Sequence, residues 1–194
     1  MNLIVIDAQT QVDLKTLVTI AHLPTRSLDR LVDQQFWKKC SDADYMRIAV
    51  LLAEKSSHEG GCPIGAVVVD NASRKIMGKG HNTLVQENHP YNHGETSAMR
   101  DAGSIDYSQT TIYTSLTPCN VCATLMVERG VARVVIGNSP DPENNETWLR
   151  ERGVEVVSVR DDQGTALYRQ YREQHPELDI IDWKGVAALR KKRP

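Results

Sequence analysis

Aromatic residues are scarce in this chain, and long apolar runs are missing. Phe, Trp and Tyr make up 5% of the 194 residues, and Phe36 is the single phenylalanine. Surfaces that bind single-stranded nucleic acid stack bases on several aromatic side chains, so this composition argues against that class. No apolar run reaches the ~20 residues that a membrane-spanning helix needs. The opening Met1–Ile6 lacks the basic residues and the length of a signal peptide, so we expect a cytoplasmic protein.

An excess of charge is also missing. The formal net charge is −2 and the sequence pI is about 6.3, which argues against a strongly basic nucleic-acid surface. The basic run at 190–193 is expected to be a solvated tail. Four cysteines in a chain of this length do not make a disulfide framework, so we expect a reducing compartment. Cys62 is expected only to pack, and Cys40 receives no role.

The other two cysteines belong to a pattern with metal-site spacing. His93-Gly94-Glu95 is followed by Pro118-Cys119-Asn120-Val121-Cys122, the H-x-E…P-C-x-x-C arrangement of zinc-dependent deaminases. Residues three apart on a helix share one face, so Cys119 and Cys122 can bind one ion. His93 supplies a third ligand, and no fourth Cys or His stands at motif spacing. Three protein ligands indicate a catalytic site that keeps one position open for water.

The cysteine pair is predicted to lie at the start of a helix. Thr117 is a good N-cap and Pro118 suits a first helical turn. The helix dipole there favours thiolates, which are the metal-binding form of cysteine. We expect one Zn²⁺ per chain, although iron also accepts these donors.

Glu95 is the predicted catalytic residue. A carboxylate beside a zinc-activated water can take its proton and pass it to a ring nitrogen and a departing amine. The expected reaction is hydrolysis of an amidine-like C–N bond with release of ammonia. Three other interpretations remain open: a redox C-x-x-C pair, a structural zinc site, and a capping box that Glu95 forms with Asn92.

The pattern of elements predicts two regions. Residues 1–40 are expected to be an N-terminal extension of unknown role, with a short strand at Leu3–Ile6 and a helix at Leu28–Trp37. Residues 41–194 are expected to form the deaminase domain. Their element order, β-β-α-β-α-β-α-β-α after a first helix, predicts an α/β fold: a three-layer α/β/α arrangement with a five-stranded mixed sheet. The expected strands are Ile64–Val69, Lys75–Gly80, Thr110–Ser115, Ala132–Ile136 and Val154–Val159.

Over roughly residues 41–183 the chain resembles the cytidine-deaminase superfamily, and within it the small cytosine deaminases that act on the free base. Gly94 stands between the His and the Glu, where nucleoside, RNA and guanine deaminases more often carry Ala. Leu116-Thr117-Pro118-Cys119 resembles that branch's Leu-Ser-Pro-Cys. Gly80-His81-Asn82 closes the second strand as it does in the same branch.

The resemblance implies further site residues and a partner. Asn82 is expected to hydrogen-bond the base, and the Gly94 N–H and the Thr117 carbonyl to face the base and its leaving amine. The segment after the last helix is expected to be a lid, from which Asp182 contacts the ring edge and Trp183 covers the ring. A homodimer is implied as well.

The function implied is deamination of free cytosine to uracil and ammonia, as in pyrimidine salvage. Alternatives are another small amino-heterocycle (isocytosine, guanine, a triazine or a creatinine-like ring), a nucleoside or tRNA deaminase, and a non-catalytic zinc-scaffold protein. The chain departs from the family at three aromatic positions of the pocket, because it has Asp179 in the lid, Val85 after the strand-end Asn, and no aromatic residue in 137–145. Such walls supply stacking and exclude water, so their loss indicates a differently shaped or more polar ligand.

Overall fold

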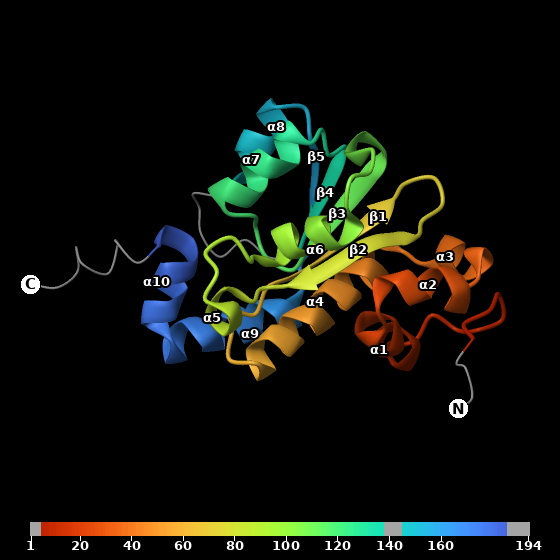
Figure 1. Ribbon diagram of the computed structural model, residues 1–194, viewed down its shortest axis with the longest axis horizontal. Helices are drawn as coiled ribbons and strands as arrows, with labels where there is room; N and C mark the ends of the chain where they lie inside the picture. The colour runs from red at the N-terminus through yellow and green to blue at the C-terminus, as the bar shows by residue number, and fades with distance from the viewer. Residues whose placement is uncertain (1–4, 138–144, 186–194) are drawn as a thin grey trace, which may run out of the picture.

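A single mixed sheet organises the computed structural model, which describes residues 5–137 and 145–185 (Figure 1). The strand order is β2-β1-β3-β4-β5, with β1 antiparallel to β2 and β3, and with β3, β4 and β5 parallel. This confirms the predicted five-stranded mixed sheet. The strands are β1 (Gly65–Asp70), β2 (Ile76–His81), β3 (Thr110–Thr114), β4 (Arg133–Ile136) and β5 (Glu155–Ser158).

Helices cover both faces of the sheet, because neighbouring strand residues point to opposite sides. Val67 and Val69 pack in one cluster with α1, α3 and α4, whereas Ala66 and Val68 pack in another with α6 and α7. The three-layer α/β/α prediction is therefore confirmed. The helices are α1 (Leu14–His22), α2 (Thr25–Leu31), α3 (Gln34–Lys39), α4 (Asp42–His58), α5 (Leu84–Glu87), α6 (Gly94–Ala102), the 3₁₀ turn Tyr107–Gln109, α7 (Asn120–Glu128), α8 (Asn145–Glu151), α9 (Asp162–Gln174) and α10 (Pro176–Lys184).

Helix α6 rests directly on the backbone of β2. A Cβ atom added to Gly78 would lie 2.3 Å from the Ala98 carbonyl oxygen, and one added to Gly80 would lie 2.6 Å from Ser97 Cβ. Both glycines therefore allow a close approach that no other residue permits. The height of α6 above the sheet is set by these two contacts.

The N-terminal helices share the core of the sheet. Phe36 and Trp37 are 0% and 1% exposed, and they belong to the same cluster as Val67 and Tyr113 of the sheet. The region predicted as an extension is thus continuous with the core on the α4 face, while the proposed boundary at residue 40 stays a prediction.

One expected helix of this region is wrong. The predicted helix Leu28–Trp37 is two helices, α2 and α3, separated at Val32 and Asp33. Asp33 caps α3 by accepting a hydrogen bond from the Gln35 N–H, and Val32 forms a β-bridge with Ile6. Val32 and Asp33 have extended backbone, so α2 ends before them. Asp33, a strong N-cap residue, then begins α3. The expected strand Leu3–Ile6 is represented by that bridge at Ile6, and residues 1–4 lie outside the described residues.

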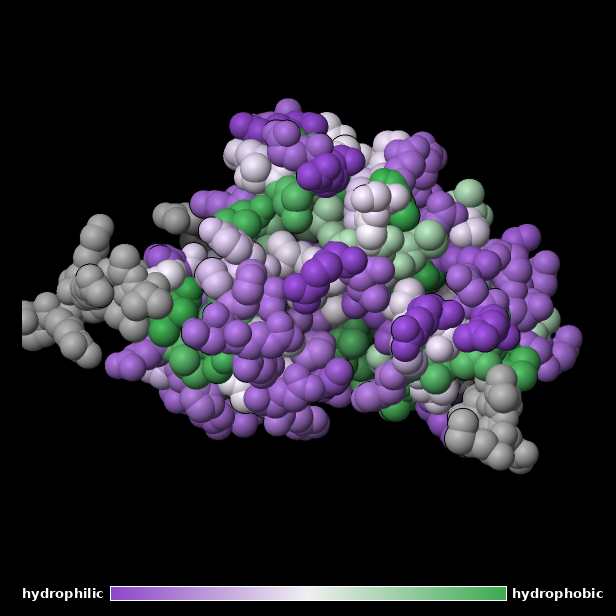
Figure 2. Space-filling model, in the orientation of Figure 1, coloured by the Kyte–Doolittle hydropathy of each residue, from purple (hydrophilic) through white to green (hydrophobic). Residues whose placement is uncertain are grey.

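Hydrophilic residues cover most of the face that Figure 2 shows. None of the helices in 5–137 and 145–185 is long and apolar enough to cross a membrane.

Candidate active site

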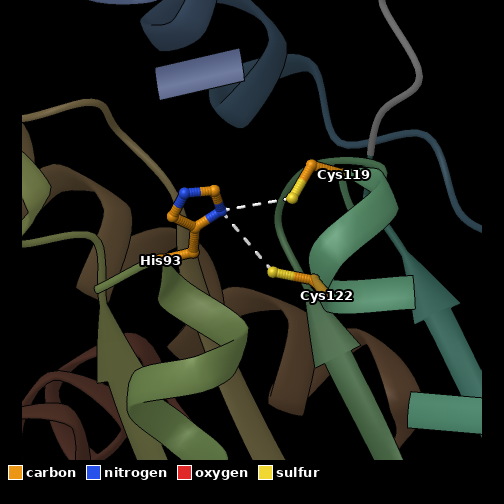
Figure 3. Close-up of side chains that lie close together, drawn as sticks. All are labelled: His93, Cys119 and Cys122. Carbon is orange, nitrogen blue, oxygen red and sulfur yellow. Dashed lines mark hydrogen bonds between the residues drawn. The ribbon is translucent and has the colours of Figure 1, made fainter. Parts of the chain in front are cut away.

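Three metal-ligating side chains point toward one another at the starts of α6 and α7 (Figure 3). His93 Nδ1 lies 3.3 Å from Cys119 Sγ and 3.6 Å from Cys122 Sγ. The three donor atoms all lie within 4.8 Å of one another. His93 and Cys122 are buried and Cys119 is half-buried. The sequence prediction that these three residues come together is borne out by this geometry.

The spacing of these donors fits zinc. Tetrahedral zinc with Zn–S of about 2.3 Å and Zn–N of about 2.0 Å places sulfur and nitrogen donors roughly 3.5 Å apart. The two observed S···N separations lie on either side of that value. A pair of thiols with one imidazole is also the donor chemistry that zinc prefers.

Local charge prepares Cys119 to bind a cation. A hydrogen bond from Cys122 lowers the pKa of the Cys119 thiol to about 4. Burial lowers the pKa of His93, but the adjacent Cys119 sulfur outweighs it and raises this pKa to about 9, with the Asp182 and Glu95 carboxylates acting in the same direction. The lowered pKa of Cys119 favours its thiolate form, which is the form that binds metal.

The N-caps of α6 and α7 lie one and two residues later than capping propensity predicts. Helix α7 begins at Asn120 with Cys119 as its N-cap, so Thr117 and Pro118 lie in the preceding loop and the predicted Thr117 cap is wrong. Helix α6 begins at Gly94 with His93 as its N-cap. In both cases a metal-ligating residue holds the cap position, because its extended backbone turns the side chain inward.

Glu95 is buried in the first turn of α6 and does not act as a helix cap. The Thr96 hydroxyl accepts the hydrogen bond from the His93 N–H, so the interpretation of Glu95 as half of a capping box with Asn92 is wrong. The Glu95 side chain is 3% exposed and accepts a hydrogen bond from the Thr114 hydroxyl at 3.1 Å. Burial raises its pKa to about 7. The carboxyl therefore holds its proton more readily than an exposed one.

Thr114 is a site residue that the sequence interpretation missed. It stands two residues after Ile112 on β3, and Ile112 faces α6 and α7. Alternation along a strand puts Thr114 on the same face, beneath the helix that carries Glu95. The period of the strand was therefore a usable signal.

Asn82 and Asp182, which are 100 positions apart, meet in the buried interior. Asn82 Nδ2 donates to Asp182 Oδ1 at 2.6 Å, and Asn82 Oδ1 accepts from the Leu84 N–H at 3.0 Å. The two side chains are 0% and 6% exposed. Burial raises the pKa of Asp182. The structure therefore brings the C-terminal helix α10 onto the residue that follows β2.

The remaining predicted residues occupy different surroundings. Gly94 lies so close to the segment before β1 that an added Cβ would be 3.0 Å from the Ile64 carbonyl oxygen. Thr117 is buried in the loop between β3 and α7. Trp183 is half-buried, and its Nε1 donates to the Tyr168 hydroxyl at 2.8 Å. Trp183 packs with Leu178 against a cluster that contains Cys62, Ile64, Leu116, Tyr168 and Tyr171.

Asp179 stands where the resemblance places an aromatic residue, and it has its own partners. It accepts a hydrogen bond from the Tyr168 hydroxyl at 2.6 Å and pairs with Arg172 at 3.5 Å. Asp179, Tyr168 and Trp183 thus form a polar connection between α9 and α10. Val85 is half-buried in α5, and the third departure falls mostly at 138–144, outside the described residues.

Sheet order, metal donors and the buried glutamate together define a zinc-binding deaminase. The sequence model described as the cytidine and deoxycytidylate deaminase zinc-binding region matches residues 39–138. The chain belongs to that family.

Relatives in the family act on different molecules. The chain is 35% identical to a cytosine deaminase of Candida albicans over 145 residues, which cover 73% of this chain and 93% of that protein. It is also 35% identical to a tRNA-specific adenosine deaminase of Haemophilus influenzae, over 50% of this chain and 58% of that protein.

Solved structures share the fold. One is described as a guanine deaminase from Nitrosomonas europaea, with a TM-score of 0.61, 23% identity, and coverage of 69% of this chain and 86% of that chain. Another comes from work on tRNA:A34 deaminases, with a TM-score of 0.57, 21% identity, and coverage of 64% and 99%. At these identities the likeness shows the fold alone.

Proposed function

We propose that this zinc-dependent deaminase acts on a free nucleobase and converts cytosine to uracil and ammonia. The observation that carries the proposal is the hydrogen bond between Asn82 and Asp182, which holds α10 against the residue that follows β2. A small ring can be enclosed beneath α10, whereas a polynucleotide needs an open groove. The 35% identity to a cytosine deaminase over 93% of its length supports the same substrate.

His93, Cys119 and Cys122 are the residues that would hold the zinc. When bound there, zinc supplies a Lewis acid that makes water nucleophilic at neutral pH. Glu95 lies on the same helix as His93, with its carboxyl buried and oriented by the Thr114 hydroxyl. In the proposed mechanism Glu95 takes one proton of the attacking water and delivers it to the ring nitrogen. It then takes the second proton from the hydroxyl of the tetrahedral adduct and delivers it to the leaving amine, which departs as ammonia.

Asn82 and Asp182 are proposed to recognise the ring edge. The amide offers both a donor and an acceptor, and the carboxylate offers acceptors for ring N–H and amino groups. The Gly94 N–H and the Thr117 carbonyl are proposed to face the base and its leaving amine. Trp183 is proposed to cover the pocket from α10, tied there by Tyr168. The proposed assembly is a homodimer.

A direct test is ammonia release by the zinc-loaded protein given free cytosine or cytidine. We expect kcat/KM for cytosine to exceed that for cytidine by about a thousandfold or more, because a pocket closed by α10 has no room for the ribose of cytidine. Equal or faster turnover of cytidine would contradict the free-base proposal.

A second candidate substrate is another amino-heterocycle, which the polar partners of Asp179 favour. The side chain that replaces an aromatic wall is engaged with Tyr168 and Arg172, so the pocket has less stacking surface than a cytosine deaminase is expected to have. Guanine and isocytosine therefore belong in the same assay. Turnover of guanine without turnover of cytosine would replace the substrate and leave the deaminase class unchanged.

Removal of one cysteine is expected to remove the metal. Cys122→Ala deletes one of three protein ligands, so zinc content measured by plasma mass spectrometry should fall from about one equivalent per chain to near zero. The matched control is Cys40→Ala, because Cys40 is also buried but packs in the α1–α4 core cluster. Zinc retained by Cys122→Ala would disprove the proposed ligand set.

A further inference from the structure

A cavity separate from the metal triad lies between the N-terminal helices and the edge of the sheet. Its volume is about 600 Å³, and residues of α1, α4, β2 and α6 line it. Figure 1 shows β2 and α6 in front, with α1 and α4 below them. None of His93, Cys119 and Cys122 lines this cavity. We refer to it as the seam cavity.

Two cationic side chains of the seam cavity have only neutral partners. Lys79 Nζ donates to the Ala21 carbonyl at 2.6 Å, and Arg100 Nη1 donates to Asn92 Oδ1 at 3.0 Å. Among the described residues, neither cation has a carboxylate oxygen at salt-bridge distance. Burial lowers the pKa of the half-buried Lys79 to about 8, and the nearby Asp101 carboxylate, which acts in the opposite direction, does not offset this effect. The charges of Lys79 and Arg100 are therefore not matched by ion pairs among the described residues.

Two hydroxyl groups of the seam cavity also lack acceptors. Thr83 Oγ1 and Ser97 Oγ are buried and have no hydrogen-bond partner within the described part of the chain. Both residues line the cavity, and Ser97 is only 9% exposed. A buried hydroxyl without a partner has lost its hydration without compensation, and a bound acceptor would supply the missing hydrogen bond.

The acidic residues of the cavity are already supplied with donors. Asp101 Oδ2 accepts from the Thr25 hydroxyl at 2.5 Å and from the Lys79 backbone N–H at 3.0 Å. Glu87 Oε2 accepts from Asn92 Nδ2 at 2.6 Å. Two further basic side chains of the lining, Lys55 and His81, pair with Glu59. The donors without an anionic partner are therefore the Lys79 ammonium, the Arg100 guanidinium and the two hydroxyls.

We propose that the seam cavity binds a small ligand through a phosphate group, either the free ion or a phosphate monoester. A tetrahedral oxyanion accepts several hydrogen bonds at once. It would also provide Lys79 and Arg100 with the anionic partner that they lack. The cavity is much larger than a phosphate ion, which leaves room for an organic group. Thr83 directly follows Asn82, and Ser97 lies on the helix of Glu95, so the ligand sits behind two elements of the proposed active site. The proposal does not depend on the deamination substrate.

Isothermal titration calorimetry of the zinc-loaded protein tests this site with inorganic phosphate, ribose 5-phosphate and adenosine 5′-monophosphate, and with ribose as the uncharged control. We expect binding of at least one phosphate compound and none of ribose. Lys79→Met should weaken that binding about tenfold to a hundredfold, because it removes one charge-assisted hydrogen bond. The matched control is Lys75→Met, because Lys75 pairs with Asp29 and lines a neighbouring cavity.

A double variant, Thr83→Val with Ser97→Ala, provides an independent measurement if Lys79→Met does not fold. It removes both donors without changing the charge, and the expected loss is about tenfold. Equal binding of free phosphate and a monoester identifies the ion as the ligand, and tighter binding of a monoester identifies the organic group as part of it; both support the site. No binding of any phosphate compound at millimolar concentration, or unchanged affinity in both variants, overturns the proposal.

Discussion

Replacement of Glu95 by glutamine is expected to lower kcat for ammonia release by about 10²–10⁴-fold. Glutamine keeps the size of the side chain and can still bond the Thr114 hydroxyl, but it cannot take a proton from water and return it to the ring. Because Glu95 is not among the metal donors, zinc content should remain about one equivalent per chain. Steady-state kinetics and metal analysis on the same preparation measure both quantities.

Glu128→Gln is the matched control for Glu95→Gln. Glu128 is exposed at the end of α7, so the same chemical change there should leave both kcat and zinc content unaltered. Full activity of Glu95→Gln would mean that another group moves the proton. Loss of zinc from it would instead give Glu95 a place in the metal site.

Replacement of Trp37 by alanine is expected to lower the free energy of unfolding by about 3–5 kcal/mol. The indole is 1% exposed and packs edge-to-face with Phe36, with ring centroids 5.8 Å apart. It belongs to the cluster that also contains Val67 and Tyr113 of the sheet. Urea unfolding followed by circular dichroism gives the free energy from the midpoint and the slope.

Leu14→Ala is the control for Trp37→Ala. Leu14 is 54% exposed in α1, and the same kind of truncation there should change the free energy of unfolding by no more than about 0.5 kcal/mol. A small effect of Trp37→Ala would show that the N-terminal helices contribute little to the stability of the fold.

The sheet and the metal triad could be predicted because each depends on short-range pattern. A short continuous apolar run such as 64–69 marks a buried strand, and a spacing of three between Cys119 and Cys122 lets both reach one ion from the start of a helix. Both patterns can be recognised in the sequence without knowing which other segments these residues contact. The close agreement of β1 and β3 with the expected strands has this origin.

Contacts across the chain could not be predicted from such patterns. The bond between Trp183 and Tyr168 joins two helices, and the sequence contains no periodicity that would assign the indole a hydroxyl partner. The predicted start of α7 was wrong for a related reason. Thr117 has a better capping propensity than Cys119, but the position of the metal donors overrides local preference. Asp33 shows the reverse case, in which a local cap interrupted an apolar pattern that favoured one long helix.

The close seating of α6 on Gly78 and Gly80 has a consequence for how this protein can diversify. His93 and Glu95 lie at the N-cap and in the first turn of one helix that packs directly on the backbone of the sheet, so the position of this helix determines the positions of both residues. Substitutions near either glycine would displace the metal donor and the carboxylate together. Helix α10, to which we assign the proposed substrate contacts of Asp182 and Trp183, comes from a part of the chain that carries none of the three metal donors. In the proposed site, residues for the reaction and residues for substrate choice therefore lie on segments that can be substituted separately.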